Sequence, residues 1–151
     1  MNGTIGYLTD DFYETYSSQY LEMEKKPDRP YLHLVLSYKN KKVVIPFRSY
    51  IRHNYAFPTS DMDNSGTFNG LDFSKALIVE EKYLSTKPAT INGKEHNIVK
   101  QNLYAIEIAF KKYVDLYKKN YIKINKGITH KAIIGMCNFS CLQYFHDEIG
   151  L

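Results

Sequence analysis

The sequence predicts an α+β fold, because its strand-like segments gather in the first half and its helical patterns in the second. At 151 residues the chain is long enough to bury a core of its own as one domain. Segment 31–38 alternates, with Leu32, Leu34 and Leu36 on one face, whereas 95–122 carries a broad apolar stripe at helical spacing. Strands followed by helices favour α+β over repeated β-α-β winding.

The first half is predicted to contain a short strand, a helix and a hairpin. Residues 4–8 read as the strand, and residues 10–23 as a helix with two aspartates in its first turn. Segments 31–38 and 42–47 pair as a hairpin through a tight turn at Asn40.

A long polar connection is expected after the hairpin. Residues 48–70 contain few core-forming side chains, and long loops in compact domains are often functional. Asp61 and Asp63 with Asn64 resemble the start of a calcium-binding loop, but no glutamate completes the pattern, so a plain polar loop is favoured. Residues 75–83 are expected to return to the sheet as a strand.

The second half is predicted to form one long helix over 95–122 and two short helices within 128–151, broken around 135–138. The end of the long helix is rich in lysine, which stabilises a helix C-terminus through the dipole. A solvated helical face is therefore favoured over a nucleic-acid-binding face. The lysines of this helix end and its exit are Lys111, Lys112, Lys118, Lys119, Lys123 and Lys126, and the first four are the candidates for binding nucleic acid.

Composition indicates a folded, soluble protein. The hydrophobic fraction is 44% and the net charge +4, which does not fit a disordered chain. Cys137 and Cys141 have no CxxC or histidine cluster beside them, so reduced thiols are favoured over a zinc site. The sequence has neither a signal-peptide pattern nor an apolar run of roughly 18 residues. We expect a cytoplasmic protein with no membrane association.

The segment 41–57, KKVVIPFRSYIRHNYAF, is the strongest candidate for a functional site. An apolar strand is followed by Arg48, Ser49, Arg52, His53 and Asn54. Arginine holds phosphate oxygens bidentately, and imidazole moves protons near neutral pH. If this loop makes one helical turn, Ser49, Arg52 and His53 share a face. A solvated basic loop after a strand is the alternative interpretation.

Several segments occur in an order that resembles a known family. A short strand, a tyrosine-bearing helix, a hairpin ending in P-x-[RT]-S, a basic loop with histidine, a GLDFSKALIV-like strand, a long helix and a final CNFSxL follow one another. This order is similar to the ToxN/AbiQ family of type III toxin–antitoxin toxins, and PFRSYIRHNYAF resembles its CptN-like branch. The most specific pieces are 46–54, 70–79 and 137–142.

The resemblance implies a strongly bent antiparallel sheet with flanking helices, an architecture like that of the Kid/MazF toxins. It implies a metal-independent endoribonuclease without cofactors that cuts mRNA and its own antitoxin precursor and takes part in phage abortive infection. The implied inhibitor is a pseudoknot RNA derived from short repeats, which alternates with the toxin in a closed protein–RNA assembly. Neither DNA nor a membrane is an expected partner.

The resemblance also implies site residues. Ser49 matches the essential serine after the hairpin, and Arg48 takes a place where relatives often carry threonine. Arg52 or His53 falls where relatives have lysine, and Tyr13 matches a groove-facing tyrosine on the first helix. The expected RNA contacts are Arg29, which lies near a lysine of relatives, together with His33, Lys39, Lys41, Asn54 and the four lysines of the long helix.

Cleavage without metal uses the ribose 2′-OH as nucleophile, and the candidate residues fit its needs. The arginines can stabilise charge on the phosphate, His53 can act as general acid or base, and Ser49 can orient the phosphate or the 2′-OH. Tyr13 can bind phosphate or stack on a base. A non-catalytic RNA-binding protein needs the same cations but neither Ser49 nor His53. A small interaction module with a tyrosine-rich interface is a third hypothesis.

Overall fold

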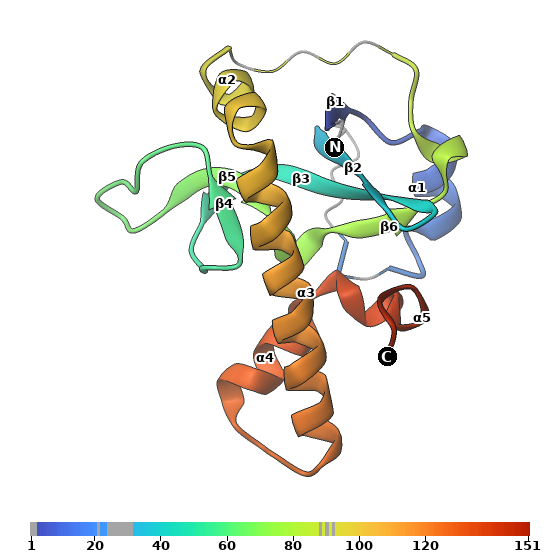
Figure 1. Ribbon diagram of the computed structural model, residues 1–151, viewed down its shortest axis with the longest axis vertical. Helices are drawn as coiled ribbons and strands as arrows, with labels where there is room; N and C mark the ends of the chain where they lie inside the picture. Colours follow the sequence, from blue (N-terminus) through green and yellow to red (C-terminus); the bar gives the residue numbers. More distant parts are fainter. Residues whose placement is uncertain (1–2, 21, 24–31, 88, 90, 92) are drawn as a thin grey trace.

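The computed structural model describes residues 3–151 except 21, 24–31, 88, 90 and 92. These residues form a six-stranded antiparallel sheet with flanking helices (Figure 1), which confirms the predicted α+β class. The strands are β1 (Thr4–Gly6), β2 (His33–Tyr38), β3 (Lys41–Ile51), β4 (Ala56–Pro58), β5 (Phe68–Asp72) and β6 (Leu77–Val79). The helices are α1 (Asp10–Tyr16), α2 (Gly93–Gln101), α3 (Leu103–Asn125), α4 (Lys131–Phe139) and α5 (His146–Ile149), with 3-10 turns η1 (Phe73–Lys75), η2 (Glu81–Tyr83) and η3 (Cys141–Tyr144).

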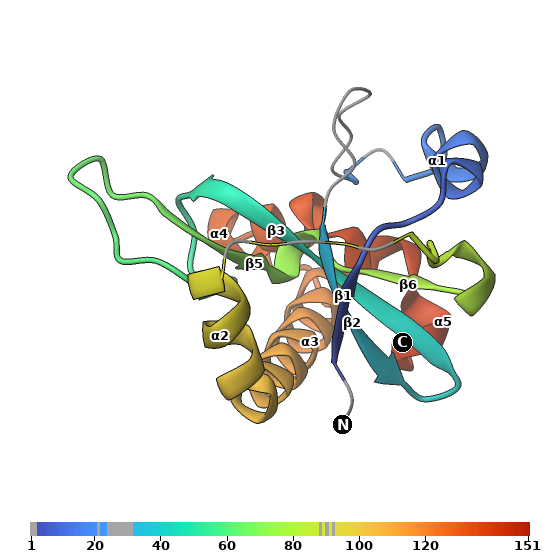
Figure 2. The same ribbon diagram turned by 90° about the horizontal axis from the view of Figure 1, so that it is seen from above.

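The sheet is organised around β3, its longest strand. β2 pairs with residues 41–46 along one edge. The other edge is shared, because β6 pairs with 42–44 and β5 with 47–51. The turn η1 carries the chain from β5 to β6 between these two pairings. Figure 2 shows β3 running the length of the sheet, from the hairpin with β2 to β5.

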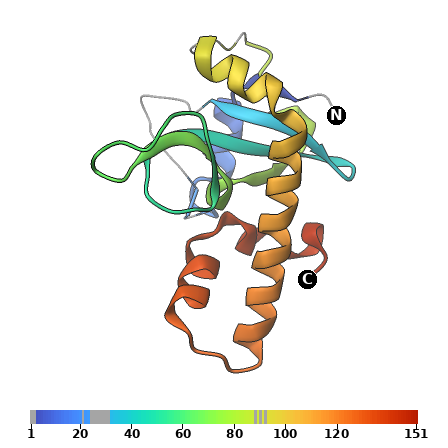
Figure 3. The same cartoon turned by 60° about the vertical axis from the view of Figure 1, so that its left-hand side comes forward.

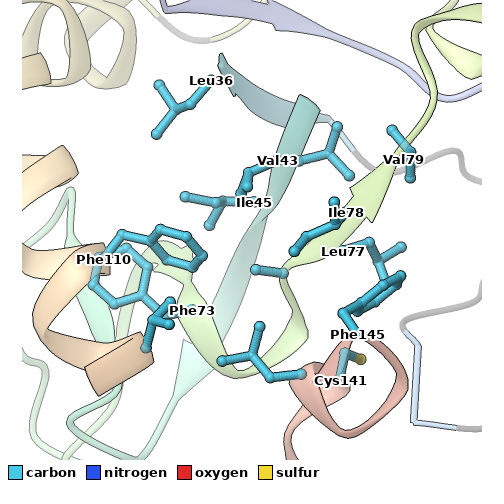
Figure 4. Close-up of a cluster of buried hydrophobic side chains, with 14 of the residues drawn as sticks. Leu36, Val43, Ile45, Phe73, Leu77, Ile78, Val79, Phe110, Cys141 and Phe145 are labelled. Carbon is cyan, nitrogen blue, oxygen red and sulfur yellow. The ribbon is translucent and has the colours of Figure 1, made fainter. Parts of the chain in front are cut away.

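Both faces of β3 are covered. Val43, Val44 and Ile45 are at most 1% exposed, and successive strand residues point to opposite faces. α3 crosses the sheet and extends beyond it, and α4 packs against this extended part of α3 (Figure 3). In the core, Phe110 of α3 meets Phe73 of η1 at a ring-centroid distance of 5.7 Å (Figure 4).

The prediction of one continuous loop over 48–70 is wrong, because three strands occupy parts of it. β3 continues to Ile51, because β5 supplies a pairing partner for its second half, and β4 and the start of β5 also lie in this segment. The helical turn that would have aligned Ser49 with His53 is therefore absent from the described structure. The strand predicted over 75–83 is confined to β6, between the turns η1 and η2.

The helical boundaries also differ from the prediction. α1 ends at Tyr16 instead of residue 23, and a turn follows in which Gln19 and Tyr20 both donate to the Tyr16 carbonyl. The single helix predicted over 95–122 is two helices, because the chain breaks at Asn102, whose side chain donates to the Ile98 carbonyl at 2.6 Å.

The break predicted at 135–138 falls instead at Ser140. α4 runs through 135–138 without interruption. Ser140 is extended, and its hydroxyl accepts a hydrogen bond from the Leu142 amide that starts η3.

Among the described residues, none of the helices has both the length and the apolar character that a membrane crossing requires.

The close approach of β4 to β5 requires glycine at position 70. A Cβ atom on Gly70 would lie against the Phe57 carbonyl oxygen, which is backbone and cannot rotate away. We expect Gly70→Ala to lower the free energy of unfolding by about 1–3 kcal/mol in chemical denaturation. The control is Gly135→Ala in α4, where a Cβ meets nothing within 4 Å and the helix gains up to about 1 kcal/mol. Equal stability of Gly70→Ala and the unmodified protein would contradict this β4–β5 pairing.

Candidate active site

A β-bulge interrupts the pairing of β3 with β5 at the centre of the predicted loop. Arg48 pairs with Gly70 and Ile51 with Phe68, so Ser49 and Tyr50 together lie opposite the single residue between those two partners. Tyr50 has a φ of 59°, in the left-handed region that a tyrosine rarely adopts. Bulges redirect side chains and are common beside active sites. Arg48 is therefore the last regularly paired residue before the bulge, and Ser49 is the first residue within it. His53 follows two residues after the end of β3.

Asp72 holds the side chains on one side of this bulge. Its carboxylate is fully buried at the end of β5, and Arg48 Nη1 donates to its Oδ2 at 2.5 Å. His53 Nε2 lies 3.2 Å from Oδ1 and 3.3 Å from Oδ2. Ser74 donates to Oδ1 through its amide at 2.9 Å and its hydroxyl at 2.6 Å. We call Arg48, His53, Asp72 and Ser74 the Asp72 cluster.

The hydrogen-bond partners of His53 assign its tautomer. Nδ1 accepts the Tyr55 amide N–H at 3.0 Å, so it carries no proton in this geometry. The proton of the neutral ring is then on Nε2, which faces Asp72. The side chain is 34% exposed. The imidazole is therefore fixed in orientation, and part of it faces solvent.

Asp72 remains ionised although it is buried. Burial alone raises the pKa of a carboxyl group. This effect is outweighed by hydrogen bonds from His53, Ser74 and Arg48, which together hold the Asp72 pKa below its ordinary value of 3.8. The buried negative charge in turn holds the Arg48 guanidinium through Nη1, with 27% of the Arg48 side chain exposed.

A series of aromatic contacts connects the Asp72 cluster to Ser140 in the C-terminal segment. The His53 ring lies 5.7 Å from that of Tyr55, which lies 5.7 Å from the buried ring of Tyr113. The Tyr113 hydroxyl hydrogen-bonds the Ser140 hydroxyl at 2.6 Å. Burial, together with the nearby charge of Asp72, raises the Tyr113 pKa, so this phenol stays neutral.

The structure brings Arg48 and His53 together but places Ser49 elsewhere. Ser49 is exposed and lines an open pocket with Tyr50 on the other side of the bulge. Arg52 and Asn54 are exposed in the bend after β3. Of the five predicted catalytic residues, two are therefore in direct contact with one buried carboxylate.

Tyr13 lies on α1, half-buried, with its ring edge-on to Phe12 at 5.5 Å. α1 is at the end of the sheet opposite β4 and β5 (Figures 1 and 2). Arg29 lies outside the described residues. His33 is only 4% exposed in β2. Its side chain therefore does not face a surface groove, contrary to the expectation that it contacts RNA.

The predicted lysine contacts lie away from the cluster. Lys39 and Lys41 are at the β2–β3 turn, where Lys39 donates to the Glu148 carbonyl and Lys41 pairs with the Glu148 carboxylate at 3.3 Å. Arg48 is seven positions along β3 from Lys41, roughly 23 Å at the usual rise per residue. The four lysines of α3 point away from its buried residues Ile106, Tyr113 and Tyr117. Three of these lysines are exposed, and Lys118 is half-buried.

Sequence reasoning missed Asp72 and Ser74. A usable signal was present, because Asp72 stands between Leu71 and Phe73 in an apolar segment. Carboxylates are rarely buried unless they are paired, so an acid at such a position indicates a cationic partner. A serine two residues after an aspartate also fits the observed side-chain cap, in which Asp72 accepts from Ser74 N.

Within the part of the chain that the structure describes, no group of three His, Cys, Asp or Glu side chains is arranged to hold a metal ion. Asp63, considered above for calcium, accepts hydrogen bonds from Ser65 and Thr67 in its own turn.

Comparison of this chain with protein-family models, with curated proteins and with solved structures found no match.

The Asp72 cluster predicts a pH-dependent stability that one substitution removes. Asp72→Asn keeps the shape but loses the charge that Arg48 and His53 contact, and we expect the free energy of unfolding at neutral pH to fall by about 1–3 kcal/mol. Because the folded-state pKa is lowered, the stabilisation is complete above the unfolded-state value. It is lost as the pH falls through the folded-state value.

Chemical denaturation should therefore show the wild type more stable than Asp72→Asn from about pH 7 to pH 5, and a difference that shrinks below about pH 4. Asp115→Asn, at an exposed position of α3, is the control and should follow the wild type. A variant as stable as the wild type at neutral pH would mean that Asp72 does not organise this site.

Proposed function

We propose that this chain is a metal-independent endoribonuclease toxin of a type III toxin–antitoxin system. In this proposal it acts in the cytoplasm and cleaves mRNA and its own repeat RNA precursor by 2′-OH attack. A pseudoknot RNA made from the repeats inhibits it within a closed protein–RNA assembly.

The observation that carries the proposal is the convergence of the three segments in which the resemblance is most specific. Arg48 and His53, from 46–54, contact Asp72 of segment 70–79. Ser140, from 137–142, contacts Tyr113, whose ring lies 6.1 Å from that of Phe73. Segments far apart in sequence thus build one site, which supports a functional reason for their joint presence.

The chemistry of the cluster suits a phosphodiester. A guanidinium fixed by a buried carboxylate is preorganised to stabilise charge that develops on a phosphate. Arg52, exposed four residues further on, adds a second cation. No reorganisation of Arg48 is needed when substrate binds, because Asp72 already sets its direction.

Proton transfer assigns a specific role to His53. The Nδ1 lone pair is the basic site of the ring, and it is reached once substrate replaces the Tyr55 amide contact. Nδ1 then takes the proton of the 2′-OH as its oxygen bonds to phosphorus, and the bond from phosphorus to the 5′-oxygen breaks. The imidazolium, or solvent, returns a proton to that leaving oxygen. Asp72 stabilises the imidazolium in between.

The same geometry favours the second candidate, a non-catalytic RNA-binding protein. In the structure both nitrogens of His53 are engaged, by Tyr55 and by Asp72. A histidine with both ring nitrogens hydrogen-bonded stabilises the loop conformation without transferring protons. Arg48 and Arg52 would then clamp the RNA backbone.

Expression in bacteria tests the toxin proposal. We expect growth to stop, and co-expression of a repeat array from directly upstream of the coding sequence to restore it. Ser49→Ala should abolish the arrest, because in this proposal the hydroxyl beside Arg48 orients the phosphate or the 2′-OH. Ser18→Ala, at an exposed serine after α1, should leave the arrest intact. Soluble expression at high level without any effect on growth would contradict the proposal.

Purified protein tests the chemistry and separates the two candidates. Cleavage should continue in excess EDTA, leave a 2′,3′-cyclic phosphate and a 5′-hydroxyl, and stop when the ribose at the cut site is 2′-deoxy. His53→Gln should slow cleavage by roughly 100-fold with little change in RNA affinity. Arg48→Ala should weaken binding and lower its salt slope by about 1.

Products with a 5′-phosphate, or cutting that EDTA abolishes, would refute the mechanism. RNA binding without cleavage by the wild type would favour the second candidate.

A further inference from the structure

A pocket lies at the β3 bulge, and its lining begins at Ser49, the residue that follows Arg48 of the Asp72 cluster. Its volume is about 270 Å³, larger than a nucleobase, and it is open to solvent. Ser49 and Tyr50 form its β3 side, and β5 and the preceding loop form the other. The remaining lining residues are Ser60, Asp61, Asp63, Thr67, Phe68 and Asn69. The chain neighbours Arg48 and Ser49 thus belong to the Asp72 cluster and to this pocket, respectively.

The loop wall of the pocket is built without a ligand. Asp63 Oδ1 accepts hydrogen bonds from the Ser65 amide and hydroxyl at 2.9 and 2.7 Å and from the Thr67 amide at 3.0 Å. Oδ2 accepts the Thr67 hydroxyl at 3.0 Å. The Ser65 hydroxyl is the largest of the effects that lower the Asp63 pKa to about 2. Both oxygens of Asp63 are thus used to close its own turn.

Asp61 is the other acidic residue that lines the pocket. Its backbone carbonyl accepts from the Ser60 hydroxyl, and its side chain is exposed. A carboxylate repels the phosphate backbone of RNA, so it contributes to RNA binding only by accepting hydrogen bonds from a base or a ribose. Acidic side chains accept from amino groups of bases, and asparagine pairs bidentately with adenine. Asn69 lines the same pocket.

Tyr50 gives the pocket an aromatic surface. Tyr50 is 76% exposed, so its ring does not gain the contact area that burial in the core would give it. The bulge holds it outward, beside Ser49, with Phe68 on the neighbouring strand. Exposed aromatic rings in RNA-binding sites stack on bases without regard to sequence.

We propose that this pocket binds a nucleobase adjacent to the scissile phosphate, with the base stacked on Tyr50 and its hydrogen-bonding edge at Asp61. Asp61 selects a base with an exocyclic amino group (adenine, cytosine or guanine) and rejects uracil, whose single N3–H lies between two carbonyl oxygens. Cleavage of that phosphate rests on the function proposed above, whereas the binding of a base does not.

The test uses binding, so that it does not depend on cleavage. The probes are four 2′-O-methyl trinucleotides, UAU, UCU, UGU and UUU, titrated into ¹⁵N-labelled protein and followed through the amides of residues 49–50 and 60–69. We expect at least one amino-bearing probe to bind about five-fold or more tightly than UUU and to shift these amides. The comparison of UAU, UCU and UGU identifies which base is preferred.

Two pairs of variants assign the roles. Asp61→Ala should bring the preference over UUU below about two-fold while strengthening the binding of UUU itself, because the hydrogen-bond acceptor is lost and a like charge is removed. Asp61→Glu should keep the preference. Tyr50→Ala should weaken all four probes by about five-fold, and Tyr50→Phe should not.

Equal binding of UUU and the other probes to the wild type, or binding that leaves the pocket amides unshifted, would overturn the proposal. An unchanged preference in Asp61→Ala would do the same. Selective base binding by a protein that cuts no RNA would refute only the nuclease assignment. RNA cleavage by a protein that binds all four probes equally would refute only the base pocket.

Discussion

The buried carboxylate of Asp72 is the constraint on which the rest of the site depends. An ionised carboxylate without partners in a protein core is strongly destabilising. Arg48, His53 and Ser74 supply those partners from three different segments. These contacts constrain the end of β3, the bend after it and the turn η1. Each of these backbone segments must place its side chain within hydrogen-bond distance of the two Asp72 carboxylate oxygens.

This constraint divides the bulge into two chemically different sides. On one side the cluster presents a guanidinium and an imidazole whose orientations are set before any ligand binds. On the other side, Ser49 and Tyr50 border a pocket with a carboxylate and an amide. A polyanion with hydrogen-bonding bases is complementary to both sides, since phosphate suits the first and a base edge the second. The proposed function and the base pocket follow from this division.

The sequence predicted what is local and missed what depends on distant pairing. The alternation at Leu32, Leu34 and Leu36 located β2, because its period is encoded within the segment itself. The second half of β3 was missed because its partner β5 lies about twenty residues away, and nothing within 48–51 signals that pairing. The left-handed conformation of Tyr50 was not predicted either, because in a sequence such a conformation is indicated only by glycine or asparagine. For the site, residue types identified Arg48 and His53, but the acid that joins them is far away in sequence and was not recognised.

The tautomer of His53 tests this account most directly, because it reports on Asp72 and on the loop at once. Long-range ¹H–¹⁵N correlation spectra of the imidazole rings, recorded at about pH 8 where histidine is normally neutral, distinguish the two nitrogens. We predict a protonated Nε2 and an unprotonated Nδ1 for His53 in the wild type, and a mixture of tautomers in Asp72→Asn. A proton on Nδ1 in the wild type, or the same tautomer ratio in both proteins, would contradict the claim that Asp72 organises the site.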